Sequence, residues 1–318
     1  MNRKTFIQQS AALTALCYLQ PIRSMAQAIQ ALDVIGIQLF SLPKSLEANV
    51  GETFEMLGKM GYKEIELYGP YPFSAESAKK RWEGLAGMLG FSASGFFGKS
   101  PKDLKALLDL NGLKTTSAHT DLDTLRNHIG ALGEAADKLG YSYVVLPAIP
   151  EEERQSLDDF KRLAEEFNKI GAAAKKVGVT FAYHNHGYGF HEVEGKIPIN
   201  LLFEGLDPEL VALEMDIYWT TAGGADPIDY LDAFPKHYKL MHLKDMKAHK
   251  TFATDGSSPQ EWMALFPFMT TAGEGVLDLP GIISKAKEIG VQHFYVEQDL
   301  VANPDIALQD SFDYLEAL

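Results

Sequence analysis

Eight short apolar runs recur along the chain, separated by longer amphipathic stretches with the 3.6-residue period of a helix. The runs are Val34–Phe40, Glu64–Tyr68, Thr115–His119, Tyr143–Ala148, Val179–His184, Val211–Asp216, Leu240–Lys244 and His293–Glu297. The clearest helical stretches are Leu125–Leu139 and Leu157–Val177. Several stretches end in a glycine just before the next run, as at Gly61, Gly140, Gly178 and Gly290. Repeated strand–helix units of this kind predict a parallel sheet, and eight of them predict a (β/α)8 TIM barrel in one domain, α/β in class.

Four runs in the C-terminal half end in side chains that can ligate metal ions. Side chains alternate along a strand, so the following pairs each share a face: His184 with His186, Glu214 with Asp216, His242 with Lys244, and Tyr295 with Glu297. Asp216 follows His184 by 32 positions, and His242 follows Asp216 by 26, about one strand–helix unit each. Successive parallel strands place their C-terminal tips at the active-site face of a barrel. We therefore expect one site.

The residue types indicate which cation this site would hold. Two imidazoles and two carboxylates suit a divalent transition metal such as manganese, cobalt or zinc, with magnesium possible, whereas calcium prefers oxygen ligands alone. The sequence contains neither a CxxC pair nor an HExxH helix, which excludes a zinc ribbon and a zincin.

Two connections are longer than the others. The segment between Tyr68 and Thr115 has two helical stretches separated by 91–98, which is rich in small and aromatic residues. It follows a barrel strand, so it forms either a lid over the site or an ordinary surface excursion. The second, Met246–Leu279, contains Gly273-Glu274-Gly275.

Residues 1–28 have the pattern of a cleaved export signal. Arg3 and Lys4 precede the short apolar segment Ala11–Leu19, and small residues at 24–28 offer a cleavage site. The start resembles a twin-arginine signal with Lys4 in place of the second arginine, which leaves the export route open. The alternative is an amphipathic helix. This nine-residue segment is too short to span a bilayer, so we expect no membrane anchor. We expect residues 29–318 to form a barrel in the periplasm.

The charge of the chain bears on its partners. Loss of residues 1–28 would remove three positive charges and no negative ones, so the formal charge would move from -14 to -17. Such a surface repels nucleic acid and anionic membranes. The only cysteine, Cys17, lies in the removed segment, so we expect no disulfide and no thiol chemistry.

Five short motifs together give the chain a family resemblance. They are YHNH at 183–186, EMDIYW at 214–219, HLKDM at 242–246, GEG at 273–275 and VEQD at 296–299. In order and spacing they resemble the sugar phosphate isomerase/epimerase family of the xylose-isomerase-like TIM barrel superfamily. The resemblance runs from Gly36 to Leu315. It implies a barrel with one divalent metal ion held by one residue from each of the last four strands.

Carried over to this chain, the implied ligands are His184, Asp216, His242 and Glu297. His184 departs from the family, which commonly has glutamate followed by asparagine there. The family's epimerases use that glutamate and the last-strand glutamate as paired bases, so an imidazole weakens the case for symmetric epimerisation. His186 is the alternative ligand at this position.

Such a site suits proton abstraction next to a carbonyl, because a metal ion that binds a keto group stabilises the resulting enediolate. The candidate bases are Glu297 and His186, and Lys244 would stabilise or protonate the oxyanion. Glu214 lies one strand step deeper than Asp216 and is either a substrate contact or a hydrogen-bond acceptor behind the ligands. The remaining candidates for substrate binding at the barrel mouth are His119, Glu66 and Tyr68.

Three functions follow, all with a small sugar as partner. The first is isomerisation or epimerisation of a keto sugar through an enediolate. The second is a metal-dependent lyase or hydratase acting on a 3-keto sugar or keto-glycoside, which needs one base and a separate acid. The third is carbohydrate binding without catalysis. We expect an unphosphorylated substrate, because Glu274 would repel a phosphate at the GEG loop. A metal-dependent endonuclease is disfavoured by the acidic charge.

Overall fold

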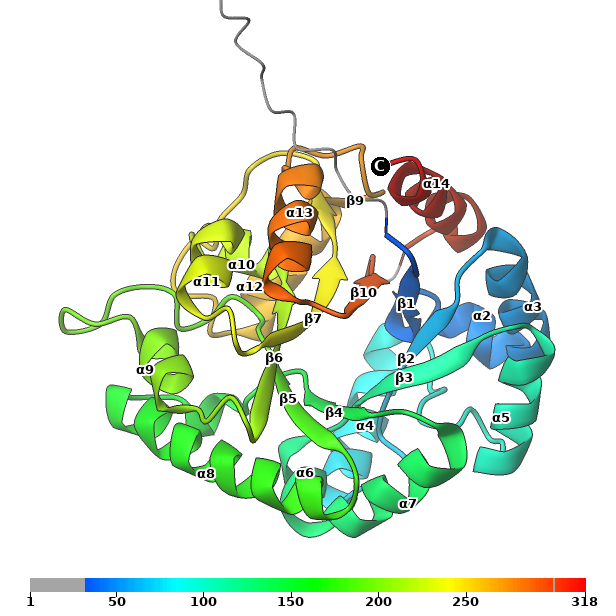
Figure 1. Ribbon diagram of the computed structural model, residues 1–318, viewed down its shortest axis with the longest axis horizontal. Coiled ribbons are helices and arrows are strands. Elements are labelled where there is room, and N and C mark those ends of the chain that lie inside the picture. The colour runs from blue at the N-terminus through cyan, green and yellow to red at the C-terminus, as the bar shows by residue number, and fades with distance from the viewer. Residues whose placement is uncertain (1–31, 300) are drawn as a thin grey trace, which may run out of the picture. The chain divides into compact units, whose positions relative to one another are not determined.

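In the computed structural model, which describes residues 32–299 and 301–318, eight parallel strands close into a barrel (Figure 1). The strands are β1 (Gly36–Gln38), β2 (Glu64–Tyr68), β3 (Lys114–His119), β4 (Tyr143–Leu146), β5 (Thr180–His184), β6 (Val211–Asp216), β7 (Tyr238–Leu243) and β10 (His293–Val296). Their order around the barrel follows the sequence, and β10 closes it between β7 and β1. The predicted TIM barrel is confirmed. Residues 1–28, where we predict the export signal, lie outside the described residues.

Helices surround the barrel and connect its strands (Figure 1). They are α2 (Pro43–Ala48), α3 (Val50–Met60), α4 (Glu76–Leu89), α5 (Pro101–Leu110), α6 (Leu122–Asn127), α7 (Ile129–Leu139), α8 (Leu157–Lys176), α9 (Pro198–Gly205), α10 (Ile217–Ala222), α11 (Pro227–Ala233), α12 (Pro259–Leu265), α13 (Leu279–Ile289) and α14 (Pro304–Glu316). Short 3-10 turns add η1 (Leu39–Ser41), η2 (Glu151–Glu153) and η3 (Phe266–Phe268). Among the described residues no helix is both long and apolar enough to cross a membrane.

Helix α8 shows how the sequence builds one of these units. The Ser156 hydroxyl accepts the backbone N–H of Asp159, whose carboxylate accepts the N–H of Ser156 in return, so a capping box starts the helix. Its inner face buries Phe160, Leu163 and Phe167 against the barrel. Each such side chain contributes about 1.5–3 kcal/mol when removed from water, so packing rather than helix propensity fixes α8.

Each of the eight predicted runs contains a strand, and most of the strands differ from the predicted run by one or two residues at an end. The first strand ends at Gln38 instead of Phe40, because the Gln38 side chain accepts the Phe40 N–H and starts η1. The seventh begins two residues earlier, at Tyr238. The helix predicted over 125–139 is wrong in one respect. It is two helices, since His128 leaves the helical conformation with φ of -128° and separates α6 from α7.

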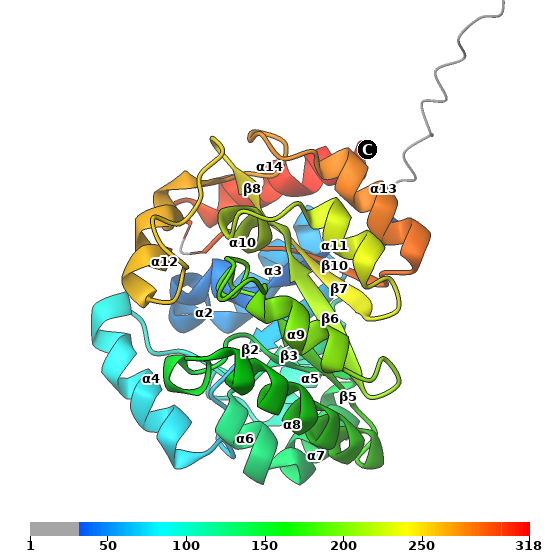
Figure 2. The same cartoon turned by 90° about the vertical axis from the view of Figure 1, so that its left-hand side faces the viewer.

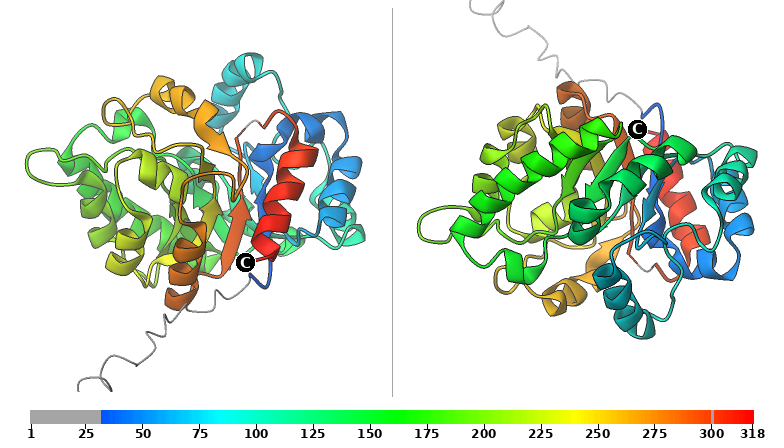
Figure 3. Two further views of the ribbon diagram at one scale, coloured as in Figure 1. Left: turned by 90° about the horizontal axis from the view of Figure 1, so that it is seen from above. Right: turned by 90° about the horizontal axis from the view of Figure 1, so that it is seen from below.

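The long connection after β2 contains the two predicted helices, α4 and α5. Residues 91–98 between them pack aromatic side chains onto Tyr68, whose ring meets Phe97 and Phe40 edge-on. Helix α4 buries only Ala78, and Figures 2 and 3 show it apart from the helices that surround the barrel.

The connection after β7 carries the antiparallel pair β8 (Asp245–Met246) and β9 (Met269–Thr270), followed along the chain by α13. Between the two short strands lies α12. Side chains from this connection form a second apolar cluster with Tyr218 and Trp219 of α10. Helices α12 and α4 lie at the same end of the barrel (Figures 2 and 3), and α12 reaches the loop after β5 through a stacking contact between Trp262 and His186.

Candidate active site

Strand register brings the predicted ligands together inside the barrel. Asp216 on β6 is paired with His242 on β7, and His184 on β5 is paired with Glu214 on β6. All four are at most 1% exposed, and Glu297, just after β10, is 6% exposed. A cluster of imidazoles and carboxylates this deeply buried must be satisfied internally or by a bound cation.

Asp216, His242 and Glu297 form the outer group of this cluster. Glu297 Oε2 lies 2.7 Å from His242 Nδ1, and Asp216 Oδ2 lies 4.0 Å from the same nitrogen. The other carboxylate oxygen of Asp216 accepts the backbone N–H of Trp219 and caps α10, which fixes the side chain.

His184 stands beside the outer group without joining it fully. Its Nε2 lies 3.7 Å from Asp216 Oδ2, and its Nδ1 lies 3.1 Å from Glu214 Oε2. The ring therefore has one nitrogen directed to Asp216 and the other bonded to a buried carboxylate. Histidine ligands of metal ions are commonly oriented in this way.

The inner group lies one layer deeper and consists of Glu66, His119, His184, Glu214 and His242. Glu66 Oε2 is 2.5 Å from His242 Nε2 and 3.1 Å from His119 Nε2. Glu214 Oε2 is 2.8 Å from His119 Nε2. Glu66, His119 and Glu214, which we predict as substrate contacts, are thus bonded to other buried side chains, and their role in substrate binding stays a prediction.

Charge pairing sets the ionisation of these groups. Burial alone would lower the pKa of His119, but the carboxylates of Glu66 and Glu214 outweigh it and raise the pKa to about 9. Burial also opposes the charge on Lys244, yet the surrounding carboxylates hold its pKa well above the usual value. Both side chains are therefore cations at neutral pH.

Lys244 lies at the centre of three carboxylates. Its Nζ is 2.6 Å from Glu297 Oε2, 3.0 Å from Asp216 Oδ2 and 3.0 Å from Asp299 Oδ2. Asp299 is not among the site residues predicted from the sequence. The signal was present, because Asp299 follows Glu297 by two positions and so shares its face. Burial and the Glu297 charge raise the pKa of Asp299 to about 7.

His186 has a fixed protonation pattern. Its Nδ1 contacts the carbonyl oxygen of Pro147, and since a carbonyl can only accept, Nδ1 carries the proton and Nε2 has the lone pair. Burial and the nearby Lys244 lower the pKa of His186 to about 3, so the ring is neutral. Trp262 of α12 stacks on it with 5.1 Å between ring centroids.

The donor set fits a divalent cation. Glu66 Oε1 and Glu214 Oε1 are buried and accept no hydrogen bond, and Asp216 Oδ2 forms an ion pair with Lys244 but accepts no well-aligned hydrogen bond. Within the described part of the chain, two groups bring three or more ligand atoms within 4.8 Å of one another: His119, His184, Glu214 and His242, and Asp216, His242 and Glu297. Neighbouring ligands of one ion with bonds of about 2.1 Å lie roughly 3–4 Å apart, which matches the separations around Asp216 Oδ2.

Two further sequence predictions can be placed. The Tyr68 hydroxyl donates to the Ala93 carbonyl at 2.8 Å, so this side chain joins the aromatic packing of the β2 connection. At the GEG loop, the carboxylate of buried Asp245 accepts the backbone N–H groups of Gly273, Gly275 and Leu277. These N–H groups could otherwise cradle a phosphate, and here an internal carboxylate already occupies them.

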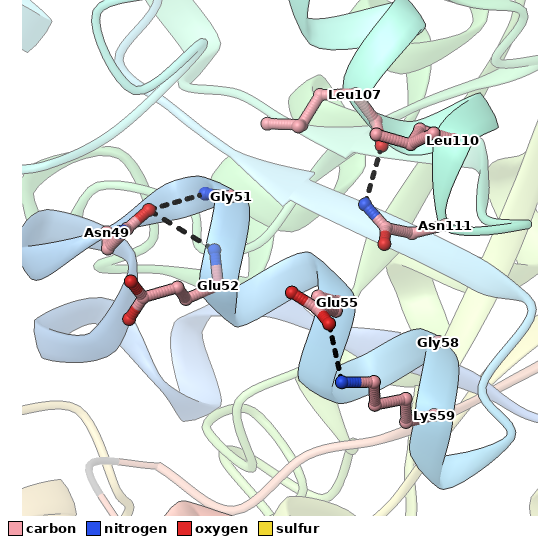
Figure 4. A pocket seen from close by; sticks show the side chains of 9 residues that line it. All are labelled: Asn49, Gly51, Glu52, Glu55, Gly58, Lys59, Leu107, Leu110 and Asn111. Carbon is pink, nitrogen blue, oxygen red and sulfur yellow. Dashed lines mark hydrogen bonds and ion pairs between the residues drawn. The ribbon is translucent and has the colours of Figure 1, made fainter.

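A surface depression between α3 and α5 lies elsewhere on the molecule (Figure 4). Its side chains bond locally, as in the pair of Glu55 with Lys59 and the cap of Asn49 on Gly51. It contains no member of the inner or outer group.

Known proteins share this fold. Residues 54–318 match the family described as "Xylose isomerase-like TIM barrel". An inosose dehydratase of Lacticaseibacillus casei is 25% identical over 257 residues, which cover 72% of this chain and 83% of the relative. A crystal structure of a sugar phosphate isomerase/epimerase from Parabacteroides distasonis superposes with a TM-score of 0.69 at 25% identity, covering 91% of this chain and 96% of the other. A crystal structure of the IOLI protein with a binding zinc atom superposes with a TM-score of 0.62 at 16% identity over 89% of this chain and 98% of the other. The chain belongs to the xylose isomerase-like TIM barrel family.

Proposed function

We propose that this protein is a metal-dependent dehydratase that removes water from an unphosphorylated keto sugar or keto polyol. The observation that carries the proposal is the similarity to inosose dehydratases over 72% of the chain. The comparison therefore favours the lyase or hydratase alternative of the sequence analysis over its first choice, isomerisation. The outer group supports it, because it offers a cation site beside a base and a separate acid.

The metal ion would be held by the outer group, through Asp216 Oδ2, His242 Nδ1 and Glu297 Oε2, together with Nε2 of the adjacent His184. When bound, it would act as a Lewis acid on the substrate carbonyl. The zinc atom of the IOLI structure supports a transition metal here. Behind these ligands, Glu214 accepts from His184 and Glu66 accepts from His242, which fixes both imidazole orientations.

His186 is our candidate for the general base. It is neutral, half-buried and has its lone pair on Nε2, as proton abstraction requires. Glu297 is bonded to both His242 and Lys244 and is less available. In the first step the bond between the α-carbon and its hydrogen breaks, the proton moves to His186 Nε2, and the electron pair forms an enediolate or enolate.

Lys244 is our candidate for the acid. It is a buried cation, and Asp299 remains as its partner when Asp216 and Glu297 are bound to an ion. In the second step the β-carbon–oxygen bond breaks, and the departing hydroxyl takes a proton from Lys244 and leaves as water. The product is an α,β-unsaturated ketone, and exchange with solvent restores both residues.

Two features support a substrate without phosphate. The backbone N–H groups of the GEG loop donate to Asp245 instead of to a ligand. The exposed carboxylate of Glu274, in the same loop, also repels a second anion. A phosphorylated substrate would therefore have no cradle at this loop.

Isomerisation or epimerisation of a keto sugar is the second candidate. It is favoured by the structural similarity to a sugar phosphate isomerase/epimerase at 25% identity. It shares the first proton transfer and differs in that the proton returns to carbon.

Incubation of the metal-loaded protein with inosose and a panel of keto sugars in deuterated water separates these functions. A dehydratase incorporates deuterium at the α-carbon and produces an unsaturated ketone with ultraviolet absorbance. An isomerase or epimerase incorporates deuterium without that product. Absence of exchange with every keto substrate, in protein shown to contain metal, would reject both.

A further inference from the structure

A buried arginine, Arg154, follows η2 in the loop after β4. It is 8% exposed, and its donors go to carbonyl oxygens: Nε to Ile149 at 3.0 Å and Nη2 to Ser257 at 2.8 Å. Ile149 belongs to the same loop, whereas Ser257 belongs to the long connection after β7. Burial of a guanidinium is costly. Because this buried guanidinium bonds two loops to each other, it indicates a role beyond packing.

Tyr188 links Arg154 to the loop after β5. The guanidinium carbon lies 3.8 Å from the centre of the Tyr188 ring, a cation–π contact. The Tyr188 hydroxyl accepts the backbone N–H of Ile149 at 2.8 Å. Ile149 is two residues after Pro147, and Tyr188 is two residues after His186. These contacts therefore lie beside the bond between His186 Nδ1 and the Pro147 carbonyl and fix the distance between the two loops.

The contact with Ser257 reaches His186 from the other side. Trp262 donates its indole N–H to the Gly256 carbonyl at 2.8 Å, next to the carbonyl that Arg154 holds. The Trp262 ring stacks on His186 with 22° between the planes. Arg154 thus contacts both segments that hold the His186 imidazole. The loop after β4 accepts the Nδ1 proton through the Pro147 carbonyl, and the connection after β7 covers the face of the ring with Trp262.

We propose that Arg154 is a positioning residue that keeps a proton of His186 on Nδ1. By fixing Ile149, Tyr188 and Ser257, it keeps the Pro147 carbonyl within reach of Nδ1 and leaves Nε2 as the proton acceptor. Without this constraint the loop after β4 can move away, and a neutral histidine side chain then prefers the proton on Nε2, where it cannot act as a base. The catalytic consequence rests on the proposed function, whereas the tautomer does not.

Nitrogen-15 NMR of histidine-labelled protein tests the tautomer directly, because the two ring nitrogens have different shifts and couplings. The His186 signals are assigned by their loss in His186→Gln. In the wild type we expect the Nδ1–H form. In Arg154→Ala and Arg154→Lys we expect the Nε2–H form, since one ammonium group cannot bridge both carbonyls. Arg162→Ala, at an arginine 47% exposed on α8, is the matched control and should keep the wild-type pattern.

A folded Arg154→Ala protein that keeps the Nδ1–H tautomer would overturn the proposal. If Arg154→Ala does not fold, Arg154→Lys decides in the same way, because it preserves the charge and the aliphatic stem.

Proton exchange in deuterated water tests the consequence for catalysis. We expect the kcat of both Arg154 variants to fall about 10- to 100-fold, part of the effect of a general base, with KM and metal content unchanged. Loss of the tautomer with an unchanged kcat would overturn the positioning role. If the wild type exchanges no keto substrate, the proposed function fails, and the NMR result still decides whether Arg154 fixes the ring.

Discussion

Glu66 Oε2 lies 2.5 Å from His242 Nε2, deep in the barrel, on the side of the imidazole that faces away from Glu297. This contact leaves Nδ1 of His242 for the outer group. Carboxylates placed in this way orient histidine ligands and raise their basicity. The bond between β2 and β7 therefore connects a residue that we expected at the substrate to the proposed metal site.

Glu66→Gln should weaken metal binding about 10- to 100-fold, since loss of such an outer carboxylate typically has this effect. Competition with a chromogenic chelator measures the affinity. Glu64→Gln is a matched control, because Glu64 lies on the same strand, is 4% exposed and pairs with His293 and Lys114 instead of the cluster. Equal affinities for both variants and the wild type would show that Glu66 does not support the site.

The tips of β6 and β7 were predictable from the sequence. Period-two alternation and the rule that parallel strands share an edge suffice to place Asp216 beside His242. The contact between the Glu66 and His242 side chains was not predictable, because it spans the barrel and depends on the register of the strands. The register of β2 against β3 also shifts between Ile65 and Glu66, and periodicity alone does not reveal this shift.

The role of Arg154 was equally hidden. Its partners are backbone carbonyls and a ring from three loops, which leave no spacing pattern in the sequence. The break at His128 was missed for a related reason. The apolar period continues across this residue, although its backbone leaves the helical conformation. Contacts set by loop geometry and barrel closure are thus the part that sequence patterns omit.

Asp216→Asn should remove bound metal and abolish proton exchange. An amide keeps the size of the side chain and can still cap α10, but it supplies no anionic ligand at Oδ2. Metal content after gel filtration and deuterium incorporation check this. Asp226→Asn is the control, because Asp226 caps α11 in the same manner at an exposed site. A metal-loaded, active Asp216→Asn protein would contradict the proposed ligand set.

Tyr62→Phe should destabilise the barrel by about 0.5–1.5 kcal/mol, the contribution of a buried hydrogen bond. The Tyr62 hydroxyl donates to the Leu308 carbonyl at 2.8 Å and fixes α14 against the barrel. Urea denaturation measures the change. Tyr143→Phe removes a hydroxyl bonded to Gln292 at the surface and should stay within about 0.5 kcal/mol of the wild type. Equal losses in both variants would show that the bond to α14 contributes nothing particular.

His184→Gln and His186→Gln should separate the two histidines of the YHNH motif. His184 is 1% exposed and has Nε2 directed to Asp216 Oδ2, so its loss should weaken metal binding. His186 has Nδ1 bonded to Pro147, stacks on Trp262 and belongs to neither group of converging ligand atoms, so its loss should leave metal content unchanged. If His186 is the base, kcat should fall about 10²- to 10⁴-fold in His186→Gln.

Metal analysis and exchange kinetics on the same preparations give both answers, with His128→Gln, at an exposed histidine, as control. Loss of metal from His186→Gln with retention in His184→Gln would exchange the two assignments and make His186 the ligand from this strand.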